Sequence, residues 1–361
     1  MKMKIGIFGL FFFLAFGQVV YSQSKQERAY EKALEAIQLV KNGEFLMAIE
    51  LLEEAKKLDP KNIIYSYELA LAHTYNEDYS QSNRILKKLL KHKDVYDQVF
   101  QLIGVNYSYL EQPNKAIEYF DKGLEKFPNS GILHLERGNM DLFAGKYDTA
   151  LYFYENGIKV APSFPSNYYW ASRIYCNSTE EVWGLIYGEI FMNLERNSQR
   201  TAEISKLLFD TYLSEIKFTS DTSMTVSFCK QMFMNFNALS DTQNPKLPFC
   251  MVYEPTLLLS IISENEININ SLDRIRTKFI ENYYEMGHHK THPNVLFEYK
   301  KKILEIGHLE SYNHWILMKG DEAGFDEWYY DNEDKWNAFI EWFTDNPLVI
   351  DKKNNFHQDQ Y

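Results

Sequence analysis

The segment GHHKTHP, residues 287–293, holds three histidines and is the part of the chain best suited to metal chemistry. Imidazole nitrogens are common zinc ligands. A catalytic zinc helix places two histidines one turn apart with a glutamate between them, but a lysine and a threonine separate His289 from His292. Because a glycine and a proline bracket the group, we expect a solvent-exposed loop between helices and no metal site.

A second group of reactive side chains is the four glutamates of STEEVWGLIYGEIFMNLER, residues 178–196. Paired carboxylates can serve acid–base catalysis, but no nucleophile accompanies them. Serine or threonine followed by acids is typical of a helix start, which is the interpretation that we prefer. The sequence contains no phosphate-binding glycine loop, nucleophile elbow or haem motif, so we expect no cofactor and no enzymatic activity.

The cysteines are Cys176, Cys229 and Cys250, an odd number with no CxxC pair. They therefore form neither a disulfide framework nor a zinc knuckle. Two interpretations stay open: Cys229 and Cys250 could pair in an oxidising compartment, or all three could be buried free thiols.

The first 22 residues have the pattern of a secretory signal peptide. Lys2 and Lys4 precede an apolar run, Ile5–Val20, that is too short to span a bilayer, and compact residues follow up to Ser22. We expect cleavage after Ser22, export to the periplasm, the cell envelope or the medium, and no membrane span afterwards.

The net charge of the 361 residues is −12, and removal of residues 1–22 deletes two lysines and no acids, which gives −14. Nucleic acids and anionic membrane surfaces are poor partners for such a chain, because binding phosphates requires a basic face. A protein or peptide partner remains. The oligomeric state is not indicated.

A period of 34 residues organises the first half of the chain. Four columns keep this spacing through four copies: Ala48, Ser82, Ala116 and Ala150; Pro60, Asp94, Pro128 and Pro162; Phe45, Tyr79, Pro113 and Tyr147; Leu52, Leu86, Phe120 and Tyr154. Each unit is expected to be two helices that bury their apolar faces only by stacking. Gly43 and Gly145 permit the tight turn between the helices of a pair.

The segments NGEFLMAIELLEEAKKLDP (42–60) and AGKYDTALYFYENGIKVAP (144–162) resemble the tetratricopeptide-repeat family. The resemblance covers residues 29–162, as four repeats at 29–62, 63–96, 97–130 and 131–164. It implies an all-α helical solenoid. The same phase predicts a degenerate fifth repeat at 165–198, with Gly184 in the small-residue column.

In this family the first helix of each repeat lines a concave face that commonly holds a peptide or a partner helix. Transferring the usual groove positions by phase gives an aromatic and amide-rich set, which favours a segment with apolar anchors. Only Asn139 and Arg173 fit the family's carboxylate-clamp positions, and no lysine does, so we expect no clamp. The predicted groove residues are Tyr30, Ile37, Tyr67, Leu71, Gln98, Gln101, Val105, Asn139, Tyr169 and Arg173.

Residues 199–361 show no 34-residue phase but have helical periodicity, which predicts a mainly helical C-terminal domain. Ser271 is the expected cap of a helix over 272–286. The alternating segment SMTVSFC, 223–229, predicts a short strand that could belong to a β hairpin. Residues 237–248 carry turn formers and are expected to form a loop.

Two hypotheses of function follow. The first is an exported, non-enzymatic scaffold that binds a protein or peptide through the concave face of the repeats. The alternative is a metal-dependent or hydrolytic enzyme, whose site lies in the C-terminal domain near the histidines and whose repeats recruit substrate. A further possibility is that the C-terminal domain itself fills the groove.

Overall fold

The computed structural model describes residues 24–220, 223–229 and 247–361. Two compact units divide the chain, one ending at Val95 and one beginning at Tyr96. The predicted signal peptide and most of the predicted loop at 237–248 lie outside the described residues.

The first unit consists of two helix pairs, α1 (Lys25–Lys41) with α2 (Phe45–Leu58) and α3 (Ile63–Tyr75) with α4 (Tyr79–Leu89). Helix α2 packs on α3, and the first helices α1 and α3 also touch. At the start of α1, Ser24 accepts a hydrogen bond from the Glu27 amide while the Glu27 carboxylate accepts one from the Ser24 amide, which is a capping box.

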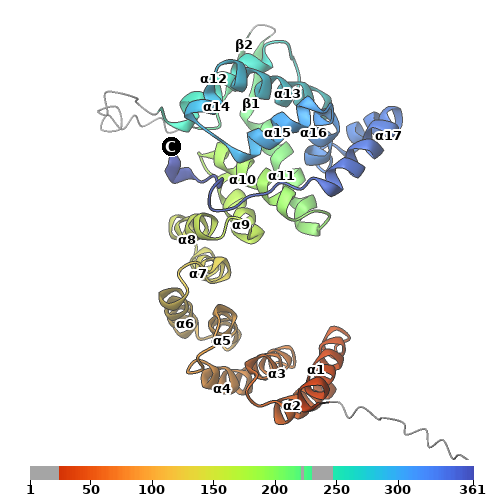
Figure 1. The fold of residues 1–361 in the computed structure, drawn as a ribbon. Helices are drawn as coiled ribbons and strands as arrows, with labels where there is room; N and C mark the ends of the chain where they lie inside the picture. The colour runs from red at the N-terminus through yellow and green to blue at the C-terminus, as the bar shows by residue number, and fades with distance from the viewer. Residues whose placement is uncertain (1–23, 221–222, 230–246) are drawn as a thin grey trace, which may run out of the picture. The chain divides into compact units, whose positions relative to one another are not determined.

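The second unit begins with three more pairs: α5 (Asp97–Tyr109) with α6 (Pro113–Lys126), α7 (Gly131–Phe143) with α8 (Tyr147–Val160), and α9 (Pro165–Tyr175) with α10 (Glu181–Leu194). First helices α5, α7 and α9 contact one another in succession. The helices of each pair and their 34-residue phase give the chain the tetratricopeptide-repeat architecture, so the predicted fold class is confirmed (Figure 1). The domain boundaries at 162, 165 and 198 remain predictions.

Helix starts follow the period through a fifth pair and one helix further. Second helices begin at residues 45, 79, 113, 147 and 181, and first helices at 63, 97, 131, 165 and 199. The helix starting at 199 is α11 (Gln199–Glu215), which packs on α9 as α9 packs on α7 and α7 on α5. The start of α11 at residue 199 thus continues the 34-residue phase. This continuation is not evident from the sequence, because a strand and not a second helix follows α11.

Residue sizes are matched where the two helices of a pair cross. Aromatic rings occupy the second-helix column at Phe120 and Tyr154, and the facing first-helix positions are Gly104 and Gly138. A Cβ atom at Gly104 would lie 2.2 Å from the Phe120 ring, and one at Gly138 would lie 2.5 Å from the Tyr154 ring. Both aromatic side chains are almost completely buried, so each glycine makes room for the ring of its own repeat.

The turn inside each of the first four pairs has one geometry. Its central residue has a positive φ in every case, 82° at Gly43, 60° at Glu77, 56° at Glu111 and 72° at Gly145. The next amide donates to a carbonyl five residues back in all four turns, as in the 2.9 Å bond from Lys146 to Asp141. This is the Schellman arrangement that ends a helix in the left-handed region.

The remaining elements form a helical assembly with one hairpin. They are β1 (Ile216–Ser220), β2 (Ser223–Val226), α12 (Phe249–Ile261), α13 (Ile269–Glu285), α14 (His288–Thr291), α15 (Val295–Glu305), α16 (Leu309–Leu317), α17 (Glu322–Asp345) and the 3-10 helix η2 (Gln358–Gln360). Strand β2 pairs antiparallel with β1, which confirms the predicted short strand and hairpin. A single hydrophobic core runs from Ala150 to Phe356 and joins α8–α10 to these helices.

The expected start of the helix over 272–286 is wrong by three residues, since the helix begins at Ile269. Helix α13 is capped by Asn268, whose side chain accepts from the Ser271 amide, so Ser271 is the third residue of the helix and not its cap. Asn268 and Ser271 are both residue types that cap helices, and the structure places the cap at the first of them.

The last residues run back over the second helices of repeats four and five. The Gln358 amide donates to the Tyr187 hydroxyl at 2.9 Å, and the Tyr175 hydroxyl donates to the Gln358 side chain at 2.7 Å. Phe356 is fully buried against Trp183. The segment after α17 therefore packs on the pair α9–α10, and the Asn355 side chain also donates to the Lys159 carbonyl of α8 at 3.3 Å. Among the described residues, no helix has the length and apolar character needed to cross a membrane.

Candidate functional site

The candidate site is the first-helix face of the second unit, defined by the predicted groove residues of α5, α7 and α9: Gln98, Gln101, Val105, Asn139 and Arg173. Their helices contact one another in the order α5, α7, α9. Gln98 and Arg173 are exposed, whereas Gln101, Val105 and Asn139 are half-buried. The face therefore presents polar groups that are anchored at their base and accessible to solvent.

A row of hydrogen bonds links α5 to α7 across this face. The Gln101 amide donates to Oε1 of Glu136 at 2.8 Å, and the Asn139 amide donates to Oε2 of the same carboxylate at 3.4 Å. The Asn139 carbonyl oxygen accepts from the Tyr154 hydroxyl at 2.9 Å. These bonds fix the rotamers of Gln101 and Asn139, so the face is organised before any partner arrives.

Glu136 lies at the centre of this row, and the groove prediction missed it. Burial raises the pKa of its carboxyl, and the hydrogen bonds from Gln101 and Asn139 partly oppose that shift. Its column reads Leu34, Glu68, Leu102, Glu136 across the repeats. The signal that could have revealed it was an acid at a position that is leucine in other repeats.

Tyr169 belongs to the predicted set but is not available to a partner. Its side chain is 4% exposed because α11 packs on α9, and its hydroxyl donates to Glu203 of α11 at 2.6 Å. The Arg200 guanidinium of α11 also lies 5.0 Å from the Tyr169 ring centre. Helix α11 thus covers Tyr169, one of the two groove positions predicted in the fifth repeat. This coverage is limited to one end of the face, whereas the hypothesis above had the C-terminal domain fill the groove.

Arg173 stays exposed next to this covered position. Its guanidinium stacks 4.8 Å from the Trp170 ring centre and donates to the Tyr169 hydroxyl at 3.0 Å. Stacking on an aromatic face holds the cation in place at the edge of the first-helix face.

The other four predicted groove residues belong to the first unit and are described separately. Tyr30 is 58% exposed on α1, and Ile37, Tyr67 and Leu71 are half-buried on α1 and α3. All four lie on the first helices of their repeats, which is where the 34-residue phase places the groove positions.

The histidines at 288–292 do not form the exposed loop that was expected. Residues 288–291 make the short helix α14, and His292 is buried, with Nε2 2.8 Å from the Leu247 carbonyl. The His292 ring stacks on Tyr361, whereas the His289 ring stacks on Tyr284. Each ring has its own aromatic partner, and within the described ranges the three do not gather as metal ligands.

The cysteine alternative is resolved by the fold. Cys229 and Cys250 form a disulfide with their Cα atoms 6.1 Å apart, and Cys176 is free. In the described part of the chain, the three side chains whose possible metal-ligand atoms lie near one another are Glu180 and the two cysteines of this disulfide. Sulfur atoms bonded to each other do not offer thiolates to a metal.

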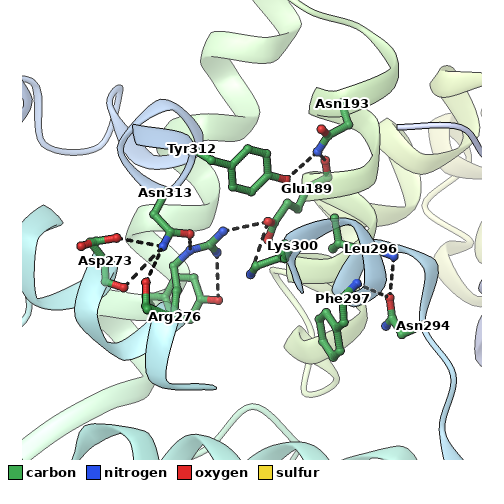
Figure 2. Close-up of polar contacts among 12 residues, drawn as sticks. Glu189, Asn193, Asp273, Arg276, Asn294, Leu296, Phe297, Lys300, Tyr312 and Asn313 are labelled. Carbon is green, nitrogen blue, oxygen red and sulfur yellow. Dashed lines mark hydrogen bonds and ion pairs between the residues drawn. The ribbon is translucent and has the colours of Figure 1, made fainter. Parts of the chain in front are cut away.

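A buried ionic cluster lies in the core of the second unit (Figure 2). One of the four glutamates of residues 178–196, Glu189, belongs to it, but its pairing with cations had no signal in the sequence. Glu189 of α10 accepts from Nη2 of Arg276 on α13 at 2.8 Å, and Nζ of Lys300 on α15 lies 3.4 Å from the same oxygen. Arg276 also donates to the Asn313 side chain at 2.9 Å and to the Tyr212 hydroxyl at 3.3 Å.

This cluster is suited to holding helices together and not to binding a substrate. Burial and the nearby Arg276 lower the pKa of Lys300 to about 7, against the opposing effect of Glu189. The cavity beside these groups has a volume of about 10 Å³, room for at most one water molecule. Glu189 and Arg276 together fix α10 to α13.

Comparison with known proteins finds likeness among solved structures. No family model matches the sequence, and no curated protein matches it. A thermophilic TPR protein from Thermus thermophilus is 17% identical, with 50% of this chain and 98% of that chain covered and a TM-score of 0.42. PilF of Pseudomonas aeruginosa is 15% identical, with 52% of this chain and 84% of that chain covered and a TM-score of 0.43. PilW, a type IV pilus biogenesis factor, is 19% identical, with 51% of this chain and 84% of that chain covered and a TM-score of 0.41.

Proposed function

We propose that this chain is an exported, non-enzymatic scaffold that binds a protein or peptide partner through the first-helix face. The observation that carries the proposal is the hydrogen-bonded row Gln101–Glu136–Asn139, which holds amide and carboxylate groups in fixed positions on an accessible surface. Side-chain amides can both donate to and accept from the backbone of an extended segment.

Rigidity supports the same interpretation. The three helices that carry the face are fixed by their own second helices and by one another, so little conformational entropy remains to be lost on binding. Exposed Gln98 and Arg173 flank the row and add a neutral donor and a cation. Half-buried Val105 offers an apolar contact between them. A peptide with apolar anchors and free backbone groups suits this surface.

The test compares two double variants in the chain without residues 1–22. Gln98→Ala with Arg173→Ala removes two exposed groups of the first-helix face. Asn114→Ala with Glu125→Ala removes two exposed groups of α6 and serves as the matched control. Crosslinking in the native cell envelope followed by mass spectrometry should identify a partner that the control retains and the face variant loses. Equal recovery with both variants would place binding elsewhere.

Export forms the second part of the proposal. Its support is the signal-like sequence of residues 1–22 together with the Cys229–Cys250 disulfide, a bond that persists mainly in oxidising compartments. Fusing residues 1–22 to an alkaline phosphatase that lacks its own signal should give active, processed enzyme. The mature chain should begin at Gln23. A fusion that stays inactive and uncut would refute export by this segment.

A further inference from the structure

We propose that Glu136 is the specificity-determining residue of the first-helix face and that it binds a cationic side chain, arginine or lysine, of the partner. This inference rests on the proposed function of the face. It adds the chemical class of the group that the partner must present.

Glu136 sits on α7, in the middle of the contacting first helices, and its two oxygens accept from Gln101 of α5 and Asn139 of α7. Each carboxylate oxygen can accept more than one hydrogen bond, so both retain acceptor capacity. The two amides orient the carboxylate in one geometry, which suits a planar, bidentate donor such as guanidinium.

Across residues 24–220, 223–229 and 247–361, no lysine, arginine or histidine is found in an ion pair with Glu136. The adjacent Arg137 pairs instead with Asp121 at 3.1 Å and with Asp141 at 2.6 Å. The pKa of the Glu136 carboxyl is raised by burial and lowered by hydrogen bonds from two neutral amides. A mostly buried carboxylate without a cation is costly, and a partner cation would offset that cost on binding.

The repeat pattern gives independent support. Two repeats earlier, Glu68 of α3 occupies the position equivalent to Glu136. Burial raises the pKa of its carboxyl too, and in the described ranges it likewise forms no ion pair. Leucine stands in the same column at Leu34 and Leu102, so this position accepts an apolar residue where no charge is required. Retention of an acid in two alternating repeats fits a role in recognition.

The experiment is a peptide selection on the chain without residues 1–22. A phage library of random 12-residue peptides is panned against the wild type and against Glu136→Gln, which keeps the shape and one of the two acceptor oxygens. We expect the wild type to enrich peptides with arginine or lysine at one fixed position. Glu136→Gln should lose that preference, while Glu125→Gln, an exposed carboxylate of α6, should keep it.

A double-mutant cycle then isolates the contact. One selected peptide is made with arginine and with citrulline at the fixed position, and each is measured against wild type and Glu136→Gln. Loss of the arginine charge should weaken binding to the wild type by about tenfold or more, and should change binding to Glu136→Gln by less than about twofold. An equal loss on both proteins overturns the inference.

The two proposals fail in different ways. Selected peptides that are sensitive to Gln98→Ala with Arg173→Ala, but that show no basic position, refute the role of Glu136 and leave the proposed function standing. A selection in which no peptide depends on the first-helix face counts against both. Thermal melts of Glu136→Gln and Glu125→Gln confirm that the fold is retained.

Discussion

Replacing the left-handed turn residue Glu111 by glycine should stabilise the second unit. Glu111 has a φ of 56°, a region that costs an ordinary residue about 1–2 kcal/mol and glycine almost nothing. Glycine also gains about 0.5–1 kcal/mol of entropy in the unfolded chain, which opposes the effect. The net expectation is a stabilisation of about 0.5–1 kcal/mol by Glu111→Gly.

The reverse change at the equivalent turn of the next repeat should destabilise the same unit. Gly145 has a φ of 72°, and a Cβ atom added there would find no other atom within 4 Å. Gly145→Ala therefore tests the backbone alone, without a steric clash against a neighbour. We expect a loss of about 1 kcal/mol.

Thermal unfolding followed by calorimetry or circular dichroism measures both variants. For a unit of this size, about 1 kcal/mol corresponds to a shift of roughly 2–4 °C in Tm. Glu111→Ala is the control, since it removes the exposed side chain but keeps the strained backbone, and it should not stabilise. If Glu111→Ala stabilises as much as Glu111→Gly, the side chain and not the backbone is responsible, and the reasoning fails.

Three other predictions concern the core. Glu189→Gln should lower the free energy of unfolding by about 3–5 kcal/mol in chemical denaturation, because it leaves Arg276 buried without a counter-charge; a loss below about 1 kcal/mol would show that the pair is dispensable. Burial raises the pKa of Glu155 to about 7, so the stability it contributes is fully present below about pH 4.5 and is lost as the pH rises through about 7. Melts at pH 4.5 to 8 should show this decline in the wild type, by up to about 3 kcal/mol, and a flatter profile in Glu155→Gln. Reduction of Cys229–Cys250 should lower stability by about 3 kcal/mol, as judged from the loop it closes, and a melt unchanged by a dithiol would contradict this.

Much of the fold could be predicted from the sequence, and so could five residues of the candidate site, but the role of Glu136 could not. Gln98, Gln101, Val105, Asn139 and Arg173 follow from phase, since a residue 34 positions away occupies an equivalent place on its helix. Predictions based on composition around the histidines were less successful. An exposed loop was expected, but His292 is buried by aromatic contacts to Tyr361 and Phe249, which are distant in sequence.

The periodic sequence by itself determined the helix pairs, their order and the residues that face inward. These features depend on local spacing and on neighbours one repeat away, so each repeat carries its own information. Gly43 and Gly145 likewise indicated the turn, because only glycine adopts a positive φ at little cost.

Only the tertiary structure decided which side chains from distant segments meet. It showed that α11 covers Tyr169 and that Glu189 pairs with Arg276. None of these contacts has a local signal, because charge pairing and coverage depend on how helices far apart in the chain pack together. Glu136 can be noticed in the sequence as an acid in a column that also holds leucines, but only the structure shows that its neighbours are neutral amides.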